Sequence, residues 1–179
     1  MAIRPVRIGL VCLLTTLAGA AQAEAIRIVA IGASNTSGYA VGASNAYPAV
    51  LERMLRAKGY DVSVENKGVT GDTSAGILSR VDSSIPAGTK VVLYDAGGGN
   101  DKDRGAAGTT AANKAAIAQR IRAHGATPIF AGVATNLGSQ QSNPAAYIPG
   151  DKHYHVTAES QRRLAAILLP KVIAAIGKK

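Results

Sequence analysis

Four short runs of β-branched and apolar residues alternate with longer segments whose apolar residues recur at helical spacing. This alternation constrains the fold more than any other feature of the chain. It predicts an α/β domain, in which right-handed crossover helices join parallel strands and cover both faces of the sheet. The expected strands are residues 26–32, 61–66, 90–96 and 127–133, and the expected helices are residues 45–59, 72–85, 108–125 and 157–177.

Local signals support the first and last of these helices. In the first, an apolar face is formed by Val50, Leu51, Met54 and Leu55, and Gly59 marks its end. In the last, Thr157 is a suitable N-cap, and Pro170 is expected to bend or interrupt the helix. The polar residues 134–155 between them are expected to form a long loop, and loops of that length are often functional.

Residues 1–23 have the pattern of an export signal. Two arginines precede an apolar run at residues 8–17, and residues 21–23 form a small-residue cleavage site. The apolar run is shorter than the roughly 20 residues that a membrane-spanning helix needs, although a retained N-terminal anchor is the alternative. We expect a periplasmic or secreted protein with one domain over residues 24–179.

The composition limits the partners of the chain. Its single cysteine, Cys12, lies in the expected signal, so the mature protein would contain neither a disulfide nor a thiolate metal site. The formal net charge of +9 favours weak attraction to an anionic membrane surface or wall polymer. Because the basic residues are scattered, aromatic residues make up 4% of the chain and Trp is absent, we expect no binding to nucleic acid.

Small and polar residues follow the expected strands, where parallel α/β sheets bind ligands. These stretches are GASNTSG, NKGVTGDTS, AGGGND and, before the last helix, GDKHYHVT. The first lacks the Gly-Lys-Ser/Thr of a phosphate loop, and Thr36 replaces the second glycine of a Gly-x-Ser-x-Gly elbow. Residues 101–105 lack the ligands of an EF-hand, and the two histidines of residues 153–155 lack a clear third ligand for zinc. We therefore expect neither a metal nor a cofactor.

Ser34 is the candidate nucleophile. A serine hydroxyl needs a base to accept its proton and an acid to orient that base, and His155 and Asp151 can supply these groups. The candidate donors for an oxyanion are the backbone amides of Ser34 and Gly71 and the side-chain amide of Asn100. By residue type alone, a serine after a strand is more often a turn residue, and a glycine-rich run is more often a tight turn.

The four stretches, in this order, resemble the blocks of the SGNH/GDSL family of serine esterases and lipases. GASNTSG is similar to the Gly-Asp-Ser block, GVTGDTSAG to the glycine block, GGGND to the Gly-x-Asn-Asp block and HVTAES to the histidine end of the Asp-x-x-His block. The similarity covers residues 26–104 and 150–170.

The resemblance implies a three-layer, flavodoxin-like α/β/α fold with a parallel sheet of four to five strands, no metal, and acyl transfer through an acyl-enzyme. It also implies that Ser34 is the nucleophile, that Gly71 and Asn100 complete the oxyanion hole, and that His155 is the general base.

The chain departs from the family pattern in three places. Ala33 replaces the aspartate of Gly-Asp-Ser, which is not the nucleophile. The family's acid lies three residues before the histidine, where this chain has Lys152, whereas Asp151 lies four residues before it. Either the loop absorbs one residue and Asp151 reaches His155, or the pair is different and His153 takes part. The segment before the histidine is also short, which leaves a fifth strand open.

These observations predict an exported serine ester hydrolase. Because the loops contain few large apolar side chains, we expect it to act on short-chain carboxylic esters. One alternative is an O-deacetylase that acts on a polysaccharide or a cell-wall sugar. The other is a non-catalytic carbohydrate- or surface-binding module on the same fold, which the shifted aspartate would favour.

Overall fold

The sheet of the computed structural model, which describes residues 24–177, contains four parallel strands in the order β2-β1-β3-β4. The expected export signal lies outside these residues. The strands are β1 (Ile26–Gly32), β2 (Val62–Gly68), β3 (Val91–Tyr94) and β4 (Thr127–Phe130). The α/β fold expected from the alternating pattern is confirmed. β3 and β4 end earlier than expected: a glycine run follows β3, and a helix already begins at Val133, which was expected to belong to the fourth strand.

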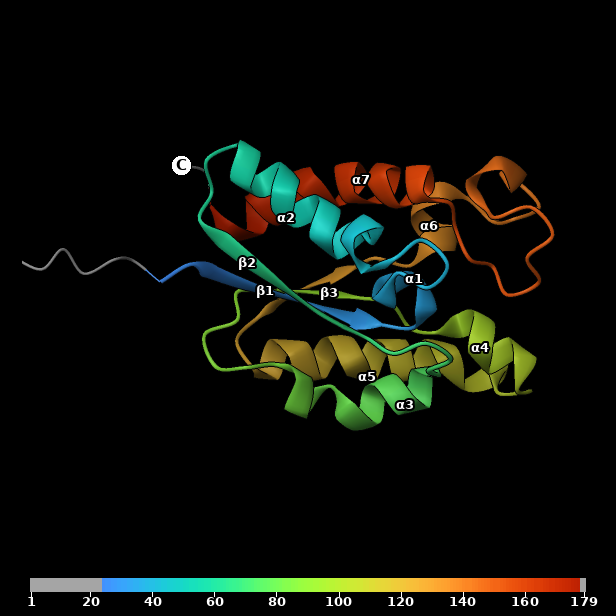
Figure 1. Ribbon diagram of the computed structural model, residues 1–179. Helices are drawn as coiled ribbons and strands as arrows, with labels where there is room; N and C mark the ends of the chain where they lie inside the picture. Colours follow the sequence, from blue (N-terminus) through green and yellow to red (C-terminus); the bar gives the residue numbers. More distant parts are fainter. Residues whose placement is uncertain (1–23, 178–179) are drawn as a thin grey trace, which may run out of the picture.

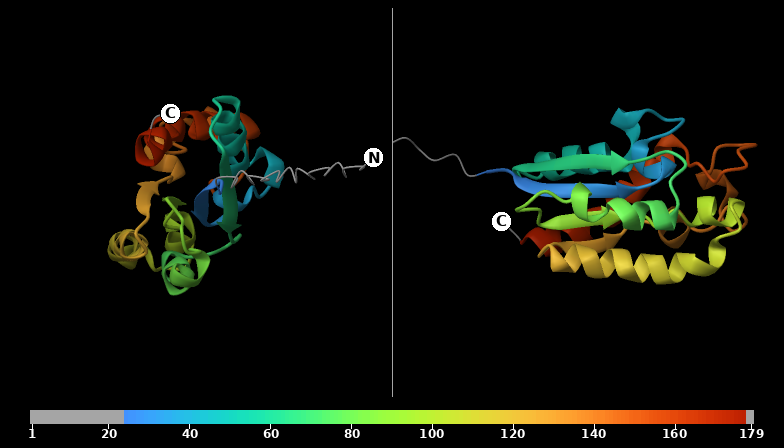
Figure 2. Two further views of the ribbon diagram at one scale, coloured as in Figure 1. Left: turned by 90° about the vertical axis from the view of Figure 1, so that its left-hand side faces the viewer. Right: turned by 90° about the horizontal axis from the view of Figure 1, so that it is seen from below.

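Helices cover both faces of this sheet. Figure 1 shows α2 and α7 on one face and α3 and α5 on the other, and Figure 2 shows the same layers from two further sides. The helices are α1 (Ser34–Ser37), α2 (Tyr47–Ala57), α3 (Ser74–Arg80), α4 (Gly98–Asp103), α5 (Thr110–Ala123), α6 (Val133–Leu137) and α7 (Ala158–Ile176). Within residues 24–177, no helix is long and apolar enough to cross a membrane.

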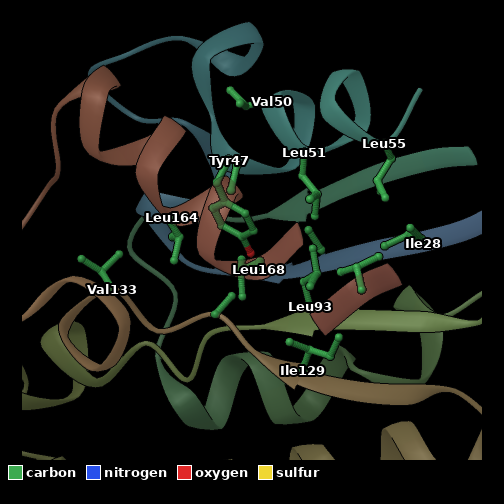
Figure 3. Close-up of a cluster of buried hydrophobic side chains, with 14 of the residues drawn as sticks. Ile28, Tyr47, Val50, Leu51, Leu55, Leu93, Ile129, Val133, Leu164 and Leu168 are labelled. Carbon is green, nitrogen blue, oxygen red and sulfur yellow. The ribbon is translucent and has the colours of Figure 1, made fainter. Parts of the chain in front are cut away.

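The larger of two buried clusters lies between the sheet and the α2/α7 layer. Along β1 the side chains alternate, so that Ile28 and Ala30 join this cluster and Val29 and Ile31 join the one beneath α3 and α5. The larger cluster includes Tyr47, Leu51, Leu55, Leu93, Ile129, Leu164 and Leu168 (Figure 3). Because helices cover both faces of the sheet, a ligand can reach it only at an edge, and in parallel α/β sheets ligands bind at the carboxyl edge.

The last helix differs in one respect from its expected form. The Thr157 hydroxyl accepts a hydrogen bond from the Ser160 amide at 3.2 Å, so the predicted N-cap is confirmed. A bend or an interruption was expected at Pro170, and the interruption does not occur, because α7 runs unbroken from Ala158 to Ile176. Proline removes the hydrogen bond to the carbonyl four residues earlier, at Ala166. Both residues are exposed, so water can satisfy that carbonyl.

Short helices also occur where none was expected. The connection over residues 134–155 contains most of α6 and a single 3₁₀ turn at Pro144–Ala146. α1 begins at Ser34, just after β1, and α4 begins at Gly98, within the glycine run that follows β3. Both are too short for apolar periodicity to reveal them. Both lie at the carboxyl edge of the sheet (Figure 1).

Candidate active site

The stretches that follow the strands meet at the carboxyl edge of the sheet, on the right in Figure 1. In the order β2-β1-β3-β4, the connection after β1 leads outward to β2 and the connection after β3 leads outward to β4, on the opposite side, which opens a crevice between β1 and β3. A cavity of about 590 Å³ lies there, lined by residues that follow β1, β3 and β4. Ser34 and Asn100 line this cavity; Gly71, Asp151 and His155 lie outside its lining.

Ser34 is placed by a tight turn at the end of β1. A Cβ atom at Gly32 would collide with the Thr36 side chain and would lie 2.9 Å from Asp95 Cβ, so the strand must end in glycine. The amides of Thr36 and Ser37 both donate to the carbonyl of Ala33, which starts α1 at the serine. Ser34 is 7% exposed and borders the cavity.

Asp151 reaches His155 despite the extra residue between them. Asp151 Oδ1 lies 3.1 Å from His155 Nδ1, and Oδ2 accepts the His155 amide at 2.7 Å. Burial alone would raise the pKa of Asp151, but these hydrogen bonds and the charge of His155 outweigh it and lower the pKa. An ionised carboxylate only accepts hydrogen bonds, so His155 carries its proton on Nδ1 and its Nε2 is the basic nitrogen.

The extra residue is absorbed by an unusual backbone conformation. Tyr154 has a φ of +63°, in the left-handed region that non-glycine residues seldom adopt. It immediately precedes His155, so the chain turns sharply before the imidazole and brings it back to Asp151. This turn is how the structure accommodates a spacing of four residues instead of three.

His153 contacts a different carboxylate. Its Nδ1 lies 3.4 Å from Asp103 Oδ2 at the end of α4, and both side chains are largely exposed. The rings of His153 and His155 are 6.2 Å apart between centroids, so two histidine–aspartate pairs lie side by side. In the described residues 24–177, no three His, Cys, Asp or Glu side chains are grouped so that they could hold a metal ion.

Gly71 lies on the loop after β2, and Asn100 lies in the first turn of α4, which follows β3. Asn100 Nδ2 donates to the carbonyl of Asp72 at 2.7 Å, which leaves its second amide hydrogen for the cavity. Gly71 has a φ of +80°, a conformation that favours glycine. Gly97 lets the loops approach, because a Cβ atom there would lie 2.8 Å from the Asp72 carbonyl oxygen. Within residues 24–177, no hydrogen bond engages the amides of Ser34 and Gly71.

Arg80 holds the glycine loop against the sheet. Its Nε donates to Asp72 Oδ2 at 2.8 Å, and its terminal nitrogens donate to the carbonyls of Gly32 and Lys67, where β1 and β2 end. The Arg80 side chain is 23% exposed and that of Asp72 13% exposed, so this ion pair is partly shielded from solvent. One side chain therefore fixes three segments that surround the Ser34 turn.

The cavity combines small side chains with charged ones. Lys114 Nζ lies 3.4 Å from the centroid of the Phe130 ring, and Lys102 Nζ lies 3.5 Å from Tyr154 Oη. Asp95, directly after β3, also lines the cavity, and burial raises its pKa. The small lining residues are Ala33, Ala96, Gly97, Gly98, Gly99, Ala107, Ala111, Gly132 and Ala134. The space suits a small apolar group next to a polar or charged one.

The raised pKa of Asp95 predicts that its ionisation opposes folding. The folded state holds this proton more tightly than the unfolded state, so stability is lost as the pH rises from the ordinary value of about 3.9 through the raised pKa. We expect Asp95→Asn to increase the free energy of unfolding near neutral pH by about 1 kcal/mol, or about 2–4 °C in Tm. Thermal unfolding at acidic and neutral pH measures this gain, which should shrink in acid. An equal gain in Asp61→Asn, a change at an exposed position, would contradict it.

Three residues at this edge were not singled out from the sequence. Asp101, 1% exposed, accepts hydrogen bonds from the Ser74 amide at 2.9 Å and the Thr110 hydroxyl at 2.5 Å, which ties α3, α4 and α5 together. The ring of Tyr39 lies 4.6 Å from that of His155 between centroids, and the Asn35 side chain bonds to the backbone beside His155. Asp101 ends the GGGND stretch and could have been found there, but nothing in the sequence marks Tyr39 or Asn35.

The chain matches the model of the GDSL-like Lipase/Acylhydrolase family over residues 30–169, a range that contains every expected site residue. It therefore belongs to this family. Esterase TesA of Pseudomonas aeruginosa is 34% identical to it over 113 residues, which make up 63% of this chain and 56% of that protein. The match thus spans little more than half of that relative's length.

Solved structures share the fold. A crystal structure of TesA matches with a TM-score of 0.68 at 24% identity and covers 83% of this chain and 99% of its own. A family 3 carbohydrate esterase from Clostridium thermocellum matches with a TM-score of 0.60 at 17% identity, over 86% and 99% of the two chains. These likenesses confirm the three-layer fold that the sequence blocks imply.

Proposed function

We propose that this protein is a serine ester hydrolase, with Ser34 as nucleophile, His155 as general base and Asp151 as the acid that orients the base. The observation that carries the proposal is the contact of His155 Nδ1 with Asp151 Oδ1 at 3.1 Å, at the edge where Ser34 borders a cavity. Membership of the GDSL-like Lipase/Acylhydrolase family supports the reaction class.

Acylation would begin when His155 Nε2 accepts the proton of Ser34 Oγ and this oxygen attacks the ester carbonyl carbon. The negative charge that develops on the carbonyl oxygen would be stabilised by the amides of Ser34 and Gly71 and by Asn100 Nδ2. The intermediate collapses as His155 returns the proton to the leaving alcohol. Water then attacks the acyl-enzyme, again with His155 as base, and the free acid leaves as Ser34 regains its proton.

Short acyl groups fit the small, partly charged cavity. Among p-nitrophenyl acetate, butyrate, octanoate and dodecanoate, we expect kcat/KM to be highest for the two shortest esters and to fall beyond about eight carbons, because longer chains would pass charged side chains and lose solvation. Initial rates with the protein from residue 24 onward measure the series. A rate that rises steadily with chain length would contradict the proposed acyl preference, while leaving the reaction class intact.

A fluorophosphonate probe tests the nucleophile without reference to substrate. Such probes form a covalent bond with an activated serine, and we expect a single adduct, found by mass spectrometry on the peptide that contains Ser34. Failure to label, together with no hydrolysis of any ester, would favour the non-catalytic binding module. The four-residue spacing between Asp151 and His155 favoured this module, but it no longer does so strongly, because Asp151 reaches His155 through the turn at Tyr154.

Deacetylation of a glycan is the second candidate function. Lys102, Lys114 and Tyr154 line the cavity, and these side chains offer hydrogen-bond donors to sugar hydroxyl or carboxylate groups. A carbohydrate esterase shares the fold, although at an identity that shows the fold alone. Acetate release from acetylated xylan and from acetylated peptidoglycan, compared with hydrolysis of p-nitrophenyl acetate, separates the two candidates.

Export is part of the proposal and rests on the residue pattern of positions 1–23. Expression of the full chain in a Gram-negative host, followed by fractionation and mass analysis of the N-terminus, tests it. We expect a periplasmic or extracellular product that begins at Glu24. A full-length product in the cytoplasm would contradict export and would leave the proposed chemistry unaffected.

A further inference from the structure

Asn35 bonds to the backbone on both sides of His155. Its Nδ2 donates to the carbonyl of Tyr154 at 3.1 Å, and its Oδ1 accepts from the amide of Val156, also at 3.1 Å. Asn35 follows Ser34 directly in α1. A single side chain therefore connects the turn of the proposed nucleophile to the backbone of the proposed base, although the two segments are far apart in the sequence.

The segment that is held in this way has a strained backbone. Tyr154 has a φ of +63°, and such conformations persist only where the surroundings enforce them. Nearby bonds, such as those from the Ile148 amide to the His155 carbonyl and from the His155 amide to Asp151, run within one connection. They fix the shape of that connection and leave its distance from Ser34 undetermined.

Two other polar contacts from outside the connection are weaker anchors. The contact of His153 with Asp103 is 3.4 Å long and that of Lys102 with Tyr154 Oη is 3.5 Å long, and both join exposed side chains to α4. Such contacts contribute little, because solvent screens them and the side chains lose freedom. The bonds of Asn35 are partly buried and reach the backbone itself.

The main chain of Asn35 is fixed independently. Its carbonyl accepts a hydrogen bond from Gln161 Nε2 at 2.9 Å, and Gln161 Oε1 accepts the Tyr47 amide at 2.9 Å. Gln161 is fully buried near the start of α7. Asn35 is thus held by a satisfied polar network, which gives its side chain a defined direction toward residues 154–156.

We propose that Asn35 is a positioning residue, which sets the distance and orientation of His155 relative to Ser34. The expected effect on the rate of ester hydrolysis rests on the proposed function, because that rate depends on the distance between His155 and Ser34 only if the two residues catalyse the reaction. The placement of His155 is a structural effect and can be observed separately.

The test compares Asn35→Leu and Asn35→Asp with the unaltered protein. Leucine branches at Cγ as asparagine does, but it has neither a donor nor an acceptor there. We expect kcat for p-nitrophenyl acetate to fall by about 10- to 100-fold and KM to change by less than about threefold, because a misplaced base slows chemistry more than binding. The rate of fluorophosphonate labelling of Ser34 should fall in parallel.

Asn136→Leu is a matched control for Asn35→Leu. Asn136 is partly buried and also uses both halves of its amide, since Nδ2 donates to the Gly132 carbonyl at 2.9 Å and Oδ1 accepts from Lys171 at 3.2 Å. None of its hydrogen bonds reaches residues 154–156. We expect Asn136→Leu to lower the Tm and leave kcat within about twofold of the unaltered protein. An equal loss of kcat in both leucine variants would overturn the proposal.

Asn35→Asp gives a pH signature that a merely structural role would not produce. At neutral pH an ionised aspartate still accepts from Val156 but repels the Tyr154 carbonyl. When protonated it regains a donor, so its kcat relative to that of the unaltered protein should rise as the pH falls toward about 3.9. A ratio that does not change with pH would contradict the role of the donor.

A direct observation separates this inference from the proposed function. The imidazole proton signals of His155, assigned in NMR spectra by comparison with His155→Ala, should shift in Asn35→Leu and remain in place in Asn136→Leu. Unchanged signals in Asn35→Leu would overturn the inference, whether or not the protein hydrolyses esters. Shifted signals in a protein that neither hydrolyses esters nor reacts with the phosphonate would support the placement of His155 by Asn35 and overturn the esterase function.

Discussion

Replacing Ser34 with alanine is expected to reduce kcat for p-nitrophenyl acetate by a factor of about 10⁴ or more. Without the hydroxyl there is no oxygen to form the acyl-enzyme, and His155 has no hydroxyl proton to accept. Only the oxyanion donors and the cavity remain to accelerate attack by water, and such residual catalysis is far weaker. Steady-state hydrolysis, with active sites counted by phosphonate titration of the unaltered protein, measures the loss.

Ser37→Ala is the matched control for this change. Ser37 belongs to the same short helix, and its hydroxyl donates to the Ser34 carbonyl at 2.9 Å and contacts Thr70 Oγ1 at 3.0 Å. Its removal alters the same turn without removing the proposed nucleophile, and we expect a change in kcat of less than about fivefold. A Ser34→Ala protein that keeps more than about a tenth of the activity would show that another group attacks the ester.

The layered fold could be predicted because the β-type runs and the strongly amphipathic helix α2 carry periodic signals, and because strands and helical segments alternate along the chain. The apolar positions of α2 and of the strands have to face a core, and only a few topologies accommodate such an order. The carboxyl edge of the sheet followed from the same reasoning, since the polar stretches come after the strands. The position of Ser34 at this edge followed from the sequence, whereas the cavity beside it is seen only in the structure.

The geometry of the histidine loop could not be predicted, because it depends on backbone conformations that sequence patterns do not encode. A tyrosine at φ +63° is uncommon, and nothing in GDKHYH indicates that Tyr154 adopts it. The role of Asn35 was hidden for a related reason. Polar residues after a serine occur in many turns, and only the return of residues 154–156 to the same place shows what this side chain binds.

Asp151→Asn is the second change with a large expected effect, and we expect kcat to fall by between about 10² and 10⁴. The amide that replaces the carboxylate can donate to His155 Nδ1, which moves the ring proton to Nε2 and leaves that nitrogen unable to accept the Ser34 proton in the proposed mechanism. The carboxylate also stabilises the imidazolium that forms during attack. Because the pKa of Asp151 lies below its ordinary value, the residue is ionised throughout the neutral range and the comparison needs no correction for its protonation.

Asp103→Asn is the control that decides between the two histidine–aspartate pairs. Asp103 contacts His153 at 3.4 Å, as Asp151 contacts His155 at 3.1 Å, but its pair is largely exposed. We expect Asp103→Asn and His153→Ala to keep kcat within about threefold, because neither reaches the ring that takes the proton. The reverse pattern, with activity lost in these variants and kept in Asp151→Asn, would assign the base to His153. The catalytic acid would then be Asp103, and the four-residue spacing between Asp151 and His155 would not describe the catalytic pair.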